Sequence, residues 1–207
     1  MKNKNLRFIA EIGIFTALGL ILDFMSGLYS KPLFPKGGSI SIAMVPIFII
    51  AFRWGLKGGL TIGFLIGSLQ VIYSSVFGYG LTWTVLVLTI LLDYILAYTA
   101  VGLAGVYTNK IKNSTEMASK LYYITNGILL AGVVRTVLHI VAGWFFYREW
   151  VPDFIKENHV WYYWSIIYNL GYMVPSILLC ILVTREIVKR HHEKLLNPDV
   201  FMLNNIK

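Results

Sequence analysis

Residues 129–143 read LLAGVVRTVLHIVAG, an apolar run that contains two ionisable side chains, Arg135 and His139. On a helix, residues four apart lie on the same face. If this run crosses a membrane, both groups lie at a depth where an ionisable side chain is costly and marks a functional site. A second run, ILLDYIL at residues 90–96, places Asp93 in a similar setting. We therefore expect a polar pocket inside a hydrophobic helix bundle.

The composition indicates a membrane protein. Apolar residues make up 57% of the chain, charged residues 14%, and the mean hydropathy is +0.68. A soluble domain has about 25% charged residues, which this chain lacks. Several apolar runs approach the roughly 20 residues that span a bilayer as a helix. We predict an all-α integral membrane protein, a single membrane domain over residues 1–207 with six transmembrane helices at about 6–28, 39–55, 58–77, 83–107, 121–147 and 161–188.

The apolar runs fit neither a cleavable signal peptide nor the strands of a membrane β-barrel. The first run is too long for a signal peptide, carries Glu11 and Asp23, and has no small-x-small cleavage site. The runs also lack the alternation of a membrane β-barrel and are too long for its strands. We expect Glu11 and Asp23 to reach the two membrane interfaces.

The basic residues predict the orientation. Six spans place both termini on one side, which then holds thirteen lysines and arginines against four on the other. Such an excess is typical of the cytoplasmic side, so we predict that both termini are cytoplasmic. The basic residues are scattered over short loops rather than gathered on one face, and we expect no nucleic-acid partner.

Motifs for catalysis are absent from the sequence. It contains no phosphate-binding loop, no H-E-x-x-H metal motif and no G-x-S-x-G nucleophile elbow. Its single cysteine, Cys180, excludes an internal disulfide and a cysteine-built metal site. We predict that the chain is not an enzyme and holds no cofactor or metal, so that any ATP hydrolysis takes place in partner subunits.

The polar residues at membrane depth allow two interpretations. Arg135 could simply neutralise Asp93, and His139 could bond to a backbone carbonyl. Alternatively, Asp93, His139 and Asn169 form a binding site with nearby Trp and Tyr rings. That combination suits a small, flat, polar heterocycle, including a cationic one, because aromatic faces attract positive rings.

The first span carries a small-x-x-x-small pair, Gly13 and Ala17. Such a pair lets two helices approach closely in a membrane. The spacing alone leaves open whether that second helix belongs to this chain or to a partner.

Five sequence blocks, in order along the chain, carry a resemblance to a known family. They are PKGGSISIAMVPIF at 35–48, FRWGLKGGL at 52–60, LLDYILAY at 91–98, RTVLHIVAG at 135–143 and SIIYNLGYMVP at 165–175. The chain resembles the thiamine-specific substrate-binding (S) components of energy-coupling factor (ECF) vitamin transporters. The likeness covers about residues 6–188.

The resemblance implies a set of ligand-binding residues. The positions that match the family's thiamine contacts and ring-packing aromatics are Asp93, Tyr94, Arg135, His139, Asn169, Trp83, Tyr147 and Trp164. Some members have a different aromatic residue at the positions of Tyr147 and Trp164, and an aromatic residue in place of Gly37. These departures concern the stacking on the ligand ring, not the class of protein.

The resemblance also implies partners and a location. Members of the family bind thiamine from outside and associate with a transmembrane coupling subunit and two cytoplasmic ATPases. The same resemblance assigns Gly13 and Ala17 to partner docking, and it implies a multi-pass protein of a bacterial plasma membrane. The alternatives are a stand-alone proton-coupled carrier that uses Asp93 and His139, a membrane enzyme that acts on lipid, and an S component for a different vitamin.

Overall fold

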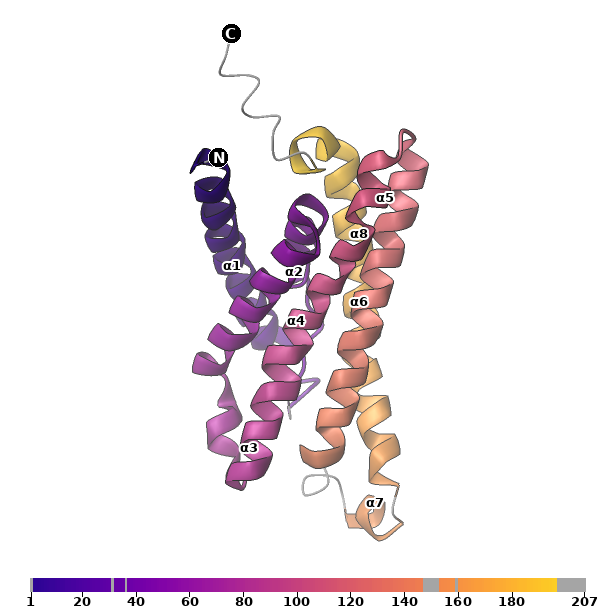
Figure 1. The fold of residues 1–207 in the computed structure, drawn as a ribbon. Coiled ribbons are helices and arrows are strands. Elements are labelled where there is room, and N and C mark those ends of the chain that lie inside the picture. The colour runs from indigo at the N-terminus through magenta and orange to yellow at the C-terminus, as the bar shows by residue number, and fades with distance from the viewer. Residues whose placement is uncertain (1, 31, 36, 147–152, 159, 197–207) are drawn as a thin grey trace.

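The protein is described by a computed structural model covering residues 2–30, 32–35, 37–146, 153–158 and 160–196. All regular structure in these ranges is helical, and five segments are long and apolar enough to cross a membrane (Figure 1). The elements are α1 (Lys2–Ser30), α2 (Val45–Tyr73), η1 (Ser75–Tyr79), α3 (Trp83–Thr89), η2 (Ile90–Leu96), α4 (Ala97–Val101), η3 (Gly102–Tyr107), α5 (Thr108–Asn113), α6 (Met117–Phe146), α7 (Asp153–Glu157) and α8 (Trp161–Leu196).

Four of the predicted spans correspond to α1, to the continuous segment Trp83–Asn113, to α6 and to α8. The spans predicted at 39–55 and 58–77 are the two arms of α2. The helical path breaks at Gly55, where φ is +80° and ψ is −170°. A Cβ atom placed on Gly59 would lie 2.7 Å from the Cβ of Ala51. Eight residues rise about 12 Å along a straight helix, so the chain doubles back here.

The predicted start of the second span, at residue 39, is wrong. Residues 39–44 are not helical, and the helix begins at Val45 with Pro46 in its first turn. Proline suits that position because it lacks the N–H that the first turn leaves unpaired. The hydropathy pattern did not distinguish residues 39–44 from the helix that follows them, because both segments are apolar. The first arm is therefore too short to span a bilayer alone, and it lies in the core, with Ile47, Phe48, Ile50, Ala51 and Phe52 fully buried.

A glycine stripe on the second arm of α2 sets its distance from the neighbouring helices. A Cβ placed on Gly63 would lie 2.3 Å from the carbonyl oxygen of Tyr98, and one on Gly67 would lie 2.6 Å from that of Tyr94. No larger residue permits this approach, which is the small-x-x-x-small packing of membrane helices. The stripe thus holds Tyr94 and Tyr98 against α2.

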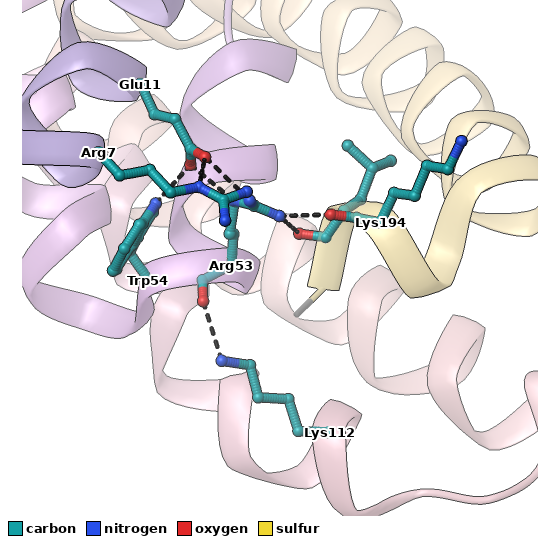
Figure 2. A network of polar contacts seen from close by, with 7 residues as sticks. Arg7, Glu11, Arg53, Trp54, Lys112 and Lys194 are labelled. Carbon is teal, nitrogen blue, oxygen red and sulfur yellow. Dashed lines mark hydrogen bonds and ion pairs between the residues drawn. The ribbon is translucent and has the colours of Figure 1, made fainter. Parts of the chain in front are cut away.

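A polar cluster closes the end of the bundle where α1 begins and α8 ends (Figure 2). Arg53 Nε and Nη2 donate to the Glu11 carboxylate at 2.5 and 2.9 Å, and Trp54 Nε1 donates to it at 2.7 Å. Arg53 Nη1 donates to the backbone carbonyl oxygens of Lys194 and Leu195. The sequence predicts only that Glu11 reaches the membrane interface, whereas the structure gives its carboxylate a packing role. It joins α1 to the turn of α2 and, through Arg53, to α8.

Candidate ligand-binding site

A cavity of about 480 Å³ lies inside the bundle. This volume is within the range of small-molecule sites, roughly 300–1,000 Å³. Its walls come from α1, the segment 34–44, α2, η1, α3, η2, α4, α6 and α8. The polar side chains among its described lining residues are Asp23, Ser39, Ser41, Gln70, Tyr73, Ser74, Ser75, Tyr79, Thr89, Asp93, Tyr94, Tyr98, Arg135, His139, Tyr172 and Ser176.

One wall joins Asp93 to His139 and Arg135. Asp93 lies in η2, a π-helical turn, and Asp93 Oδ1 is 2.5 Å from His139 Nδ1. Arg135 Nε donates to His139 Nε2 at 3.1 Å across one turn of α6. Because Nε2 accepts, the imidazole proton is assigned to Nδ1, where it faces the carboxylate, and His139 is neutral. Arg135 and His139, which the sequence predicts to be neighbours, thus share one wall with Asp93. The π-helical turn that carries Asp93 is a feature that is frequent at functional sites.

A second part of the cavity wall is built around Asp23, which the sequence prediction placed at the membrane interface. That prediction is wrong, because Asp23 is 8% exposed and lines the cavity. Its carboxylate accepts hydrogen bonds from Gln70 Nε2 at 2.6 Å, from the Tyr73 hydroxyl at 3.0 Å and from the Tyr98 hydroxyl. A buried carboxylate needs such donors, and α2 and α4 supply them here.

Arg135 connects the two walls. Its guanidinium carbon lies 3.8 Å from the centre of the Tyr98 ring, within the range of a cation–π contact. The structure gives Asp93 a hydrogen bond with the neutral His139, whereas the sequence allowed Arg135 as its counter-ion. A continuous chain of contacts therefore runs from Asp23 through Tyr98, Arg135 and His139 to Asp93.

The segment between α1 and α2 covers one side of the cavity. Gly38 has φ +89°, and a Cβ placed on it would lie 2.4 Å from the Tyr172 ring. Only glycine fits both the backbone angle and the ring. The Tyr168 hydroxyl donates to Gly37 O at 2.9 Å, and Ser41 N donates to Ser176 Oγ at 2.9 Å. Residues 37–41 are therefore a close-fitting cover over α8.

The other predicted ligand contacts differ in where they lie relative to the cavity. Tyr94 lines the cavity. Asn169 is buried behind it, where its Nδ2 donates to Ser165 O at 2.8 Å and its Oδ1 accepts from the Tyr172 hydroxyl at 2.5 Å. Trp83 and Trp164 are 77% and 37% exposed and do not line the cavity. Tyr147 lies outside the described residues.

Gly13 and Ala17 lie on an exposed face of α1. A Cβ placed on Gly13 meets nothing within 4 Å. The flanking apolar side chains Ile9, Ile14 and Leu18 are exposed as well. Within the described part of the chain, this small pair therefore packs against no other helix at Gly13.

The sequence prediction missed several cavity residues. Gln70, Tyr73, Tyr98 and Tyr172 line it together with Asp23. One signal was present for Tyr98, which follows Tyr94 by four residues and so shares its helical face. Gln70 was also recognisable as a lone amide in an apolar run, which needs a polar partner in a membrane.

Fold and site define the class of protein: a multi-pass helical membrane protein with a ligand-sized cavity that is lined by many polar side chains. The family model described as "Thiamine transporter protein (Thia_YuaJ)" matches residues 9–196. The chain therefore belongs to this family of membrane transport proteins.

Two curated relatives and one solved structure are similar to the chain. It is 35% identical over 185 residues to the thiamine transporter ThiT of Bacillus subtilis (strain 168), covering 88% of this chain and 90% of the relative. It is 26% identical over 185 residues to ThiT of Lacticaseibacillus paracasei, covering 88% and 87%. The solved structure of ThiT from Listeria monocytogenes superimposes with a TM-score of 0.74 at 23% identity, covering 94% of this chain and all of that one. This last similarity shows a shared fold.

Proposed function

We propose that the chain captures thiamine from outside the cell and delivers it across the membrane as the S component of an ATP-driven ECF transporter. The observation that carries the proposal is the cavity of about 480 Å³, lined by Asp93, His139 and Arg135, in a member of the thiamine transporter family. The ThiT relatives are named thiamine transporters.

The site chemistry supports thiamine. Asp93 and Tyr94 present an acceptor and a phenol to the amino-pyrimidine and hydroxyethyl groups of the ligand. His139 and Arg135 hold Asp93 and close the wall behind it. The aromatic rings at Tyr172 and Tyr98 offer faces to the two heterocycles. Asn169 acts by holding Tyr172. We also propose Trp83, Trp164 and Tyr147 as ring-packing residues.

The proposed topology has six membrane-associated spans, counting the two arms of α2 separately, with both termini in the cytoplasm. The polar cluster of Figure 2 supports a common side for the two ends, since Arg53 contacts both Glu11 and the carbonyl of Lys194. The excess of basic residues at this end supports the cytoplasmic assignment.

Energy for transport must come from partners under this proposal. The sequence has no phosphate-binding loop. We assign ATP hydrolysis to two cytoplasmic ATPase subunits and docking of the transmembrane coupling subunit to the exposed face at Gly13 and Ala17. Small residues on a lipid-facing surface let a partner helix approach closely.

A second function is favoured by one observation, the 2.5 Å contact of Asp93 with His139. Such a pair could relay a proton, and the chain would then be a stand-alone proton-coupled carrier of a small cationic heterocycle.

One experiment separates these functions. The purified chain in detergent is titrated with thiamine, riboflavin and biotin by isothermal calorimetry, and the same chain in liposomes is tested for uptake with and without a pH gradient. The proposal requires tight binding of thiamine alone and no uptake by the isolated chain. Uptake driven by pH would instead establish the carrier. Binding of riboflavin or biotin in place of thiamine would establish an S component for a different vitamin.

A further inference from the structure

The cluster around Asp23 forms a second anionic pole of the cavity, in addition to Asp93. Gln70, Tyr73 and Tyr98 all donate to the Asp23 carboxylate. An ionised carboxylate is an acceptor only, with about four acceptor sites on its two oxygens, and three donors satisfy most of these sites. The arrangement therefore places a carboxylate whose acceptor sites are mostly filled beside the cavity that it lines.

The charges of the two poles do not cancel. Among the described lining residues, Asp23 and Asp93 carry one negative charge each, Arg135 carries one positive charge, and His139 is neutral by its hydrogen bonds. Two negative charges and one positive charge leave a net single negative charge on these groups. A single guanidinium that lies between two carboxylates compensates only one of them.

Neither acid has a cationic side chain among its hydrogen-bond partners in the described residues. Asp93 faces the proton on His139 Nδ1, and Arg135 Nε polarises that imidazole from its other nitrogen. The donors on Asp23 are an amide and two phenols, all of them neutral groups. The Arg135 guanidinium meets this pole through the Tyr98 ring rather than through the carboxylate. Because the interior of a bundle screens charge weakly, the remaining negative charge is felt across the cavity.

We propose that Asp23 is a specificity-determining residue of the ligand site, and that its charge makes the cavity select a monocationic heterocycle over a neutral ligand of the same shape. The inference rests on the proposed function, and it names which residue recognises the positive ring of thiamine. Asp93 and His139 fix the hydrogen-bonding groups of the ligand, whereas Asp23 recognises its charge.

The test compares thiamine with 3-deazathiamine, a neutral ligand of the same shape in which carbon replaces the positively charged ring nitrogen. Dissociation constants for both are measured by calorimetry on the purified full chain, wild type and Asp23→Asn. Unit charges roughly 6–10 Å apart at an effective dielectric constant of about 20 change affinity by roughly ten- to hundredfold. We expect the preference for thiamine to fall by this factor in Asp23→Asn, through weaker thiamine binding, with 3-deazathiamine bound nearly as before.

A second variant neutralises the same pole by another route. Gln70→Lys brings an ammonium group to the carboxylate that the amide now contacts at 2.6 Å, and it should lower the preference for thiamine similarly. Asp23→Glu keeps the charge and should keep the preference. Glu186→Gln removes one negative charge at an exposed ion pair with Lys189, outside the cavity, and should change neither constant.

The results of this test distinguish a failure of the Asp23 assignment from a failure of the proposed function. An unchanged ratio of the two constants in Asp23→Asn, or in Gln70→Lys if Asp23→Asn does not fold, would overturn the role of Asp23 while thiamine binding by the wild type still stood. A wild type that binds no thiamine would overturn the proposed function itself, and the assignment of Asp23 with it.

Discussion

Asp93 and His139 are 46 residues apart in the sequence, yet Oδ1 of the acid lies 2.5 Å from Nδ1 of the imidazole. The acid lies on the π-helical turn η2 and the histidine on α6. Arg135 Nε bonds to the far nitrogen of the same imidazole, which orients the proton of His139 toward Asp93. The wall of the cavity is therefore an ordered set of hydrogen bonds rather than a pair of opposite charges.

Removing either partner of this pair should weaken thiamine binding. Asp93→Asn and His139→Ala should each cost roughly 1–3 kcal/mol, the penalty for leaving a buried polar group unmatched. Calorimetric titration of each purified variant measures the loss. Asp153→Asn is the matched control, because the Asp153 side chain is 90% exposed in its contact with Lys156. Wild-type affinity in both site variants would return the pair to a structural role.

Gly38 should tolerate no side chain. Gly38→Ala would place a Cβ 2.4 Å from the Tyr172 ring at a backbone φ of +89°. We expect a loss of stability of about 1–3 kcal/mol from strain and overpacking, together with weaker ligand binding, since Tyr172 lines the cavity. Thermal unfolding in detergent and a thiamine titration measure the two effects.

Gly78→Ala is the control for this substitution, because a Cβ on Gly78 meets nothing within 4 Å. It should leave both the unfolding temperature and the thiamine affinity near the wild-type values. If Gly38→Ala behaved in the same way, the close fit of the cover against α8 would be refuted.

The Arg53 cluster should contribute to stability and little to ligand binding. Arg53 is 5% exposed and holds Glu11 with two hydrogen bonds. Arg53→Gln removes one of the two arginines that pair with the Glu11 carboxylate, the other being Arg7, and we expect a loss of about 1–3 kcal/mol. Denaturant unfolding should show this loss. Lys189→Gln, at an exposed ion pair with Glu186, should change stability by less than about 1 kcal/mol.

The thiamine affinity of folded Arg53→Gln should stay near the wild-type value, because Arg53 does not line the cavity. A stability equal to wild type would show that the cluster does not hold α1, α2 and α8 together.

The exposed small pair on α1 should matter for transport and not for binding. A Cβ placed on Gly13 meets nothing within 4 Å, so we expect Gly13→Leu to fold and to bind thiamine normally. A larger side chain at this lipid-facing position should prevent the close approach of a coupling subunit. Uptake by cells should then fall more than tenfold, which corresponds to a loss of roughly 1.4 kcal/mol or more in the free energy of association. Val133→Leu enlarges another exposed position, on α6, and is the control.

Normal uptake by cells carrying Gly13→Leu would assign the docking surface to another face. Loss of thiamine binding in the same variant would instead show that the position supports the fold.

The sequence could predict which polar side chains lie together where one helix carries the information. Arg135 and His139 share a helical face because they are four residues apart, and they line the cavity together. The prediction for Asp23 failed because hydropathy gives the depth of a residue but not the direction of its side chain. Its three donors come from α2 and α4, up to 75 residues away in sequence.

The apolar composition and the length of its runs determined by themselves that the chain is a helical membrane protein, because backbone polar groups in lipid must be satisfied within each segment. The ionisable residues inside those runs determined that a polar site exists. Only the tertiary structure decided how these charges are paired. The short first arm of α2, the approach permitted by its glycines and the turn of η2 bring side chains together from separate helices. Contacts of this kind depend on helix rotation and register, and a one-dimensional pattern does not specify either of them.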